Sequence, residues 1–153
     1  MQYKGVLIAV KDMERSKRFY AELVDQEVTM DLGKNVTLSG GFFLQEGFPQ
    51  LMGLDEHSVV WQPHNMELYF ETEDFDGFLR RLEEHPEARL VHGPKKYPWQ
   101  QRVVRLYDPD GHIIEVGEAM DAIARRYLRE GFSVQETAAI IQHPVSFVEG
   151  CRG

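Results

Sequence analysis

The chain has 153 residues, of which 42% are hydrophobic, so it can bury one ordinary core but is too short for two full domains. Its net charge of −8 repels phosphate backbones and anionic lipids, which argues against nucleic acid or a membrane as a partner. A single cysteine, Cys151, and the lack of a long apolar run argue against a disulfide-stabilised secreted protein or a membrane span. We therefore expect a cytoplasmic protein whose chain starts at Met1.

The first third of the chain predicts one strand, one helix and three further strands. An apolar run at residues 5–10 is followed by Asp12, a good N-cap, and by residues 15–23, whose apolar side chains recur at helical spacing. Short β-prone runs separated by turn residues then follow at residues 27–32, 36–38 and 42–45.

The same order of elements recurs in the second half. Residues 67–72 alternate like a strand, Asp74 is a second N-cap, and residues 75–82 place apolar side chains on one helical face. Strand-like runs follow at residues 90–92, 103–107 and 112–116. The repeat predicts that one structural unit occurs twice.

Each half ends in the same five-residue frame, a glycine, three mostly apolar residues and then Gln or Glu. The frames are GFFLQ at residues 41–45 and GHIIE at residues 111–115, so Gln45 and Glu115 are equivalent positions. We expect an α+β fold in which two βαβββ modules form a curled mixed sheet around a pocket. The first module takes residues 1–46 and the second takes residues 64–118. Residues 47–63 connect them, so the whole domain takes residues 1–118.

Two stretches resemble the vicinal oxygen chelate superfamily, which includes glyoxalase I, extradiol dioxygenases and the fosfomycin and bleomycin resistance proteins. They are residues 10–20 (VKDMERSKRFY) and, more specifically, residues 108–115 (DPDGHIIE). Residues 67–71 (ELYFE) with residues 98–105 (PWQQRVVR) further resemble a bacterial glyoxalase-like subgroup without an assigned reaction. The resemblance covers residues 3–118 and implies the glyoxalase/bleomycin-resistance fold, a small-molecule ligand and a homodimer.

The resemblance also implies where a metal would bind. In the superfamily, metal ligands come from the first and last strands of each module, and those places hold Gly5, Gln45, Glu67 and Glu115 here. Metal-binding members commonly have histidine in this set, and this chain has none there. Gln45, Glu67 and Glu115 are thus the candidate metal ligands, and a set of oxygen ligands favours Mg²⁺ or Mn²⁺ over Zn²⁺.

Strand geometry brings a cation close to these carboxylates. Alternation places Glu67 on the hollow side of its strand, and the turn at residues 108–111 sets a register in which Arg105 lies opposite Glu115. Two carboxylates in a partly desolvated hollow need a positive counterpart or a shared proton. A divalent metal, the guanidinium of Arg105, or one proton shared by the pair as a general acid or base would each meet this need.

These arrangements lead to two main hypotheses. In the first, the protein is a metal-dependent lyase, isomerase or dioxygenase with Glu67 and Glu115 at its catalytic centre. In the second, it binds or sequesters a small molecule without a metal, similar to bleomycin-resistance proteins. The ligand-binding residues would then be Arg105, Tyr69, Phe43, Trp99 and Gln101.

Residues 119–153 predict a helical extension. Gly131 ends one helix, Ser133 and Glu136 form a capping-box pattern, and Pro144 opens a last short helix. Three short helices can resemble a helix-turn-helix, but the four arginines of this segment are balanced by four acidic residues, whereas DNA readout needs a basic face. We expect packing against the barrel or a dimer partner, with a ligand-responsive regulator as a third alternative.

Overall fold

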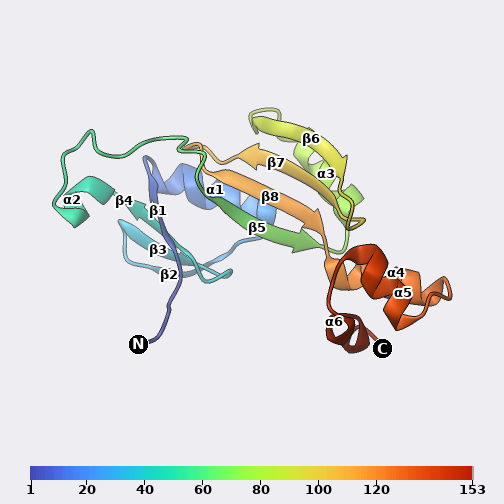
Figure 1. The fold of residues 1–153 in the computed structure, drawn as a ribbon. Coiled ribbons are helices and arrows are strands. Elements are labelled where there is room, and N and C mark those ends of the chain that lie inside the picture. Colours follow the sequence, from blue (N-terminus) through green and yellow to red (C-terminus); the bar gives the residue numbers. More distant parts are fainter. Residues whose placement is uncertain (153) are drawn as a thin grey trace. The chain divides into compact units, whose positions relative to one another are not determined.

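The computed structural model describes residues 1–152, which fall into two compact units. The first unit contains residues 1–67, 85–89 and 107–113, and the second contains the rest of the described chain. The elements, labelled in Figure 1, are β1 Leu7–Val10, α1 Met13–Val24, β2 Val28–Asp31, β3 Asn35–Leu38, β4 Phe43–Glu46, α2 Phe48–Met52, β5 Glu67–Thr72, α3 Phe75–Glu83, β6 Leu90–Lys96, β7 Arg102–Tyr107, β8 Ile113–Glu118, α4 Met120–Arg129, α5 Val134–Ile141 and α6 Val145–Gly150.

The two four-stranded sheets repeat one topology. The first has the order β1-β4-β3-β2, and the second has the corresponding order β5-β8-β7-β6. In the first sheet β1 runs parallel to β4, and the remaining neighbours are antiparallel. The predicted α+β fold with two βαβββ modules is confirmed, although the strands form two separate sheets that are not closed into one.

Alternation within the strands explains which side chains form each core. In β1, Ile8 and Val10 are buried while Leu7 and Ala9 are half-buried, as a period of two requires. In β5, Leu68 is buried while Glu67 and Tyr69 are exposed. Each sheet therefore has one apolar face and one face free for polar side chains.

Each module's helix begins at the predicted aspartate. Asp12 accepts a hydrogen bond from the Arg15 N–H at 2.9 Å, and Asp74 accepts one from the Gly77 N–H at 2.8 Å. Among residues 1–152, no helix combines the length and apolar character needed to cross a bilayer. The fold thus rests on short capped helices that pack on sheets.

The strand predicted at residues 90–92 is longer than expected and runs to Lys96 as β6. Gly93 and Pro94, which follow the predicted run, are both residues that weaken strands. The structure accommodates them by shifting the register between β6 and β7 twice. His92, in the predicted run of residues 90–92, lies in β6, and the strand continues for four residues beyond it.

The C-terminal helices α4 to α6 belong to the second unit. Ser133 and Glu136 form the predicted capping box at the start of α5, and Gly131 has a positive φ of 96° just after α4. Arg125 of α4 forms an ion pair at 2.6 Å with Glu73, which directly follows β5. The extension packs against the second module, whereas a boundary at residue 118 stays a prediction.

Candidate functional site

The middle of the second sheet contains an ion pair between Arg105 of β7 and Glu115 of β8. Their side chains are 22% and 8% exposed, so the pair is largely desolvated while Arg105 can still be reached. The turn at residues 108–111 sets this register, because the Asp108 N–H donates to the His112 carbonyl at 2.9 Å. The structure thus brings together the cation and one carboxylate of the predicted site.

Arg105 also contacts two residues that the sequence patterns did not single out. Its Nη1 donates to the Tyr97 hydroxyl at 2.7 Å and lies 3.3 Å from Nε2 of His92, which stands opposite it in β6. Arg105 can only donate, and the Gly93 carbonyl, 2.7 Å from Nδ1 of His92, can only accept. Both contacts suit a His92 tautomer with its hydrogen on Nδ1, and a row of His92, Arg105 and Glu115 crosses three neighbouring strands.

A second polar network links three residues of the predicted site. The Gln101 side-chain amide donates to the Tyr69 hydroxyl at 2.7 Å and accepts from the indole N–H of Trp99 at 2.8 Å. The Tyr69 hydroxyl in turn donates to Glu71 at 2.5 Å. Partial burial, and then the bond to Glu71, raise the pKa of Tyr69 well above its usual value, so Tyr69 is a neutral hydrogen-bonding group.

The first module has a neutral pair at the equivalent place. Asn35 of β3 lies opposite Gln45 of β4, and its amide donates to the Gln45 side-chain oxygen at 2.9 Å. The Gln45 amide also donates to the Glu46 carbonyl at 2.8 Å, so this buried side chain is held at both ends. Asn35 and Gln45 thus occupy in the first sheet the positions of Arg105 and Glu115 in the second.

Position 5 is closed to any side chain. Gly5 has a φ of 136°, and a Cβ added there would lie 2.2 Å from the Gly41 carbonyl oxygen and 3.0 Å from the ring of Phe43. Phe43, a predicted ligand-binding residue, is half-buried in β4 and its ring lies in this space. A side chain that binds a metal therefore cannot stand at position 5, just before β1, in this backbone.

The side chains present do not fit a divalent metal. Gln45 is bonded to Asn35, and Glu115 is paired with Arg105, whose charge would repel a second cation nearby. In the described residues 1–152, no three His, Cys, Asp or Glu side chains are grouped as a metal site would require. Glu67 is exposed at the start of β5, and its convergence with Glu115 stays a prediction.

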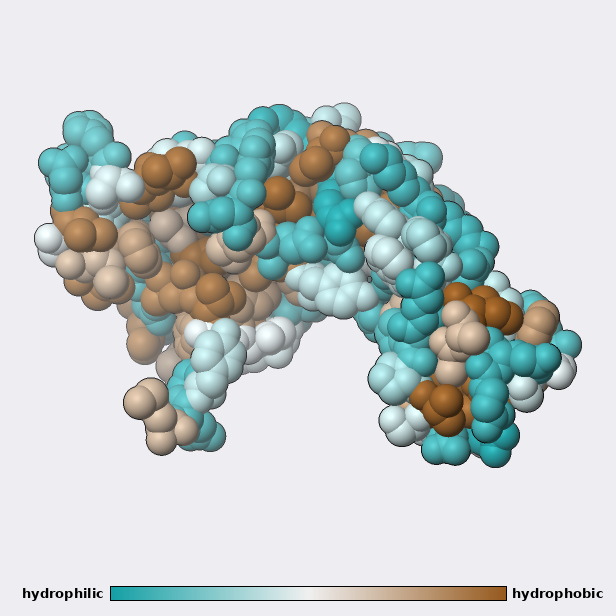
Figure 2. Space-filling view, in the orientation of Figure 1, coloured by the Kyte–Doolittle hydropathy of each residue, from teal (hydrophilic) through white to brown (hydrophobic). Residues whose placement is uncertain are grey.

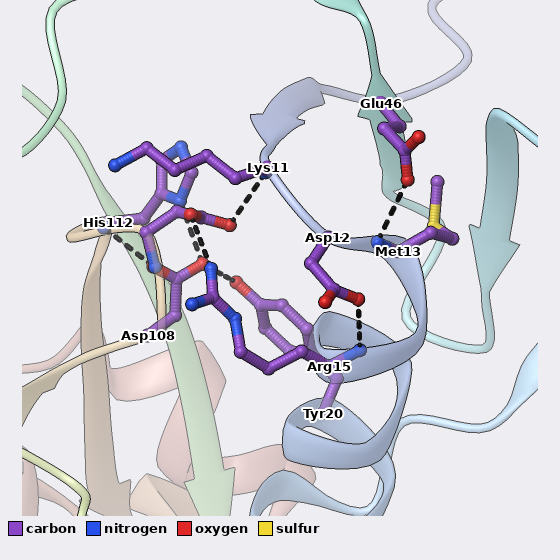
Figure 3. Close-up of polar contacts among 9 residues, drawn as sticks. Lys11, Asp12, Met13, Arg15, Tyr20, Glu46, Asp108 and His112 are labelled. Atoms are coloured by element: carbon purple, nitrogen blue, oxygen red, sulfur yellow. Dashed lines mark hydrogen bonds and ion pairs between the residues drawn. The ribbon is translucent and has the colours of Figure 1, made fainter.

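A buried network that the sequence did not reveal joins the 108–111 turn to α1 (Figure 3). The Asp108 carboxylate accepts from the Tyr20 hydroxyl at 2.8 Å and contacts Nδ1 of His112 at 2.7 Å. Burial, and then the nearby Asp108 charge, raise the pKa of Tyr20 well above its usual value. Every member is engaged and buried, so this network stabilises the fold.

The neighbouring Asp110 fastens the start of α1 to the same turn. Its carboxylate accepts from the Arg15 guanidinium at 2.7 Å and from the Lys11 N–H at 3.1 Å (Figure 3). The Met13 N–H, also at the start of α1, donates to Glu46 at 3.1 Å. The two acidic residues of the turn motif, Asp108 and Asp110, therefore stabilise the fold by joining the turn to α1 and to the segment before it.

The duplicated strand order and the face built by the last two strands of each module define the vicinal oxygen chelate superfamily. The sequence model of a glyoxalase-like domain matches residues 3–121, and the chain belongs to this family. No curated protein matches the chain.

Solved structures with the same fold include a protein of unknown function from Agrobacterium tumefaciens str. C58. It is 36% identical, with a TM-score of 0.68, and the match covers 78% of this chain and 94% of that one. The fosfomycin resistance protein FosX from Mesorhizobium loti is 16% identical, with a TM-score of 0.57, covering 77% and 92%. A lactoylglutathione lyase from Agrobacterium tumefaciens is 22% identical, with a TM-score of 0.58, covering 76% and 92%.

Proposed function

We propose that this glyoxalase-like protein binds a small molecule on the polar face of its second sheet without a metal. Arg105 would anchor an anionic or oxygen-rich group of the ligand. The main support is that each module fills its equivalent positions with its own cross-strand pair, Asn35 with Gln45 and Arg105 with Glu115. A guanidinium holds carboxylate or phosphate oxygens in two-point contacts and requires no metal to do so.

The surroundings of Arg105 support a flat, partly apolar ligand. Tyr69 is 49% exposed and offers both a ring face and a hydroxyl group fixed by Gln101 and Glu71. Aromatic rings with a fixed polar end are common in small-molecule sites, because they combine apolar contact area with a directional hydrogen bond. A contact of Phe43 with the ligand stays a prediction.

The test compares binding before and after metal removal. Protein purified without nickel is analysed for bound metals and is titrated with salicylate, a flat carboxylate with a neighbouring hydroxyl group, by two-dimensional NMR. We expect well under one metal ion per chain, and unchanged salicylate binding after exhaustive chelation.

Two arginine variants provide the specificity control. Arg105→Ala should abolish salicylate binding, because it removes the anchoring charge. Arg80→Ala, which removes an arginine with a 70% exposed side chain on α3, should leave binding unchanged. Equal loss in both variants would mean that general surface charge is responsible.

A stoichiometric divalent metal would overturn the proposal. If that metal disappeared in both Glu115→Gln and Glu67→Gln together with a lyase or dioxygenase activity, the metal-enzyme hypothesis would hold instead. The ion pair with Arg105 would then have to open when the metal binds.

We further propose a homodimer that involves the first sheet. β2 is an edge strand with all four residues exposed, and Val28 and Met30 are among them. Figure 2 shows hydrophobic side chains gathered over the first sheet and α2. The corresponding edge strand of the second sheet, β6, instead bears Pro94, Lys95 and Lys96, which discourage edge pairing. A second copy of the chain is therefore expected at β2.

A further inference from the structure

The three C-terminal helices share an apolar core of their own. The family model ends at residue 121, so α5 and α6 are additions to the glyoxalase-like domain. Their core consists of seven buried residues, Met120, Ile123, Ala124, Val134, Ala138, Ile141 and Val148. A core of this size fixes whatever side chain of the second module packs against it.

Trp99 is the side chain of the 97–101 loop that packs against this core. Its indole ring stacks on Tyr97, with ring centroids 4.5 Å apart and an interplanar angle of 18°. Its N–H is directed to Gln101. Trp99 is thus packed against the helical core, Tyr97 and Gln101, and its role as a ligand-binding residue stays a prediction.

Tyr97 connects this stack to the ligand anchor. Its hydroxyl accepts a hydrogen bond from Nη1 of Arg105 at 2.7 Å, and the guanidinium lies 5.6 Å from its ring centroid. The described contacts therefore run from the helical core through Trp99 and Tyr97 to Arg105. An arginine held before the ligand arrives loses less conformational freedom on binding.

A second connection reaches the same face from α4. The Met120 N–H, at the start of α4, donates to Glu71 at 3.3 Å, and Glu71 accepts the hydroxyl hydrogen of Tyr69. Both polar groups proposed to touch the ligand, Tyr69 and Arg105, are thus joined to the C-terminal helices by short chains of contacts.

We propose that Trp99 is a positioning residue through which α4 to α6 hold Arg105 in place and so set the affinity of the ligand site. The inference rests on the proposed function for the location of the ligand. It assigns the C-terminal extension a role in binding, in addition to packing.

The test uses substitutions that separate the stack from the core. Trp99→Leu keeps an apolar side chain in the helical core but removes the ring that faces Tyr97, and Tyr97→Phe keeps the stack but removes the hydroxyl. We expect each to weaken salicylate binding about tenfold, and the double variant to be no weaker than Trp99→Leu alone, because both act through one contact chain. Trp99→Phe should restore binding to within about threefold of the natural protein. Trp61→Phe, in the first unit, is the matched control.

The NMR signal of the Arg105 Nε–H group gives a readout that needs no ligand. It should be sharp and shifted in the natural protein and in Trp99→Phe, and it should collapse toward the signals of exposed arginines in Trp99→Leu and Tyr97→Phe. If salicylate fails to bind but this signal behaves as expected, the proposed ligand class is wrong and the positioning role stands. An unchanged Arg105 signal in both folded variants overturns the inference.

Discussion

The absence of a side chain at position 5 is itself a structural requirement. Gly5 adopts a positive φ beside the Gly41 carbonyl, so an added methyl group meets backbone that cannot easily yield. We expect Gly5→Ala to lower the free energy of unfolding by about 3 kcal/mol, through backbone strain and overlap together. Denaturant titration followed by circular dichroism would measure this.

Gly33→Ala is the control for the strain component alone. Gly33 also has a positive φ, of 80°, but nothing lies within 4 Å of the site of an added Cβ. Its substitution should cost about 1 kcal/mol. Equal losses in the two variants would contradict the close approach seen at Gly5.

Tyr20 makes the protein less stable at high pH. Its folded pKa is raised, so its contribution is fully present below the unfolded value of about 10 and is lost as pH rises through the folded value. Above pH about 10, the slope of stability against pH should be less steep in Tyr20→Phe than in the natural protein, by up to about 1.4 kcal/mol per pH unit.

Unfolding measurements at pH about 9 and about 11 test this linkage. At the lower pH, Tyr20→Phe should be about 2 kcal/mol less stable, because Asp108 loses a hydrogen bond donor. The difference should shrink at the higher pH. The prediction would be contradicted if the difference in stability between the two proteins were the same at both pH values. Tyr20 would then lose its proton equally in the folded and the unfolded state.

Among the helices and strands, those with a regular hydrophobic pattern could be predicted from the sequence, and those with irregular pairing could not. β5 spans the predicted residues 67–72, and the aspartate caps of α1 and α3 were predicted because their signals are local. β6 was underestimated because its register shifts accommodate Gly93 and Pro94, which a local pattern treats as breakers.

The same distinction applies to the candidate site, where contacts that follow from regular strand register could be predicted and the others could not. The pair of Arg105 with Glu115 followed from one turn and a constant register. The contacts of Arg105 with Tyr97 and His92 depend on where an irregular strand and a loop return, and no periodicity encodes that. The packing of Trp99 against the C-terminal core was not predictable, because its partners there are distant in sequence.

The equivalence of the two cross-strand pairs can be tested by transplanting one onto the other. Gln45→Glu places a buried carboxylate next to the Glu46 carbonyl that Gln45 now bonds, and should cost about 3 kcal/mol. Adding Asn35→Arg should recover at least half of this loss by recreating the pair of the second module. Denaturant titration of the two single variants and the double variant gives the coupling energy; additive losses would contradict the equivalence.

At the scale of the whole molecule, the proposed dimer predicts a different response at the two sheet edges. Light scattering after gel filtration should give twice the 17.7 kDa chain mass. Met30→Lys places a charge on β2 and should give monomers, because an unpaired charge at a strand edge opposes pairing.

Leu90→Lys places the same charge on β6, where the natural side chain is 48% exposed. It should leave the mass unchanged. A dimer that survives Met30→Lys and dissociates in Leu90→Lys would place the interface on the second sheet.

The limits of the family domain are a poor guide to where this protein can be cut. A fragment ending at residue 121 would keep the sequence that defines the family and would lose most of α4 and all of α5 and α6. The Trp99 side chain would then be exposed to solvent. The shortened protein would tend to aggregate through this exposed apolar surface. A practical minimal version of this protein must retain the last three helices.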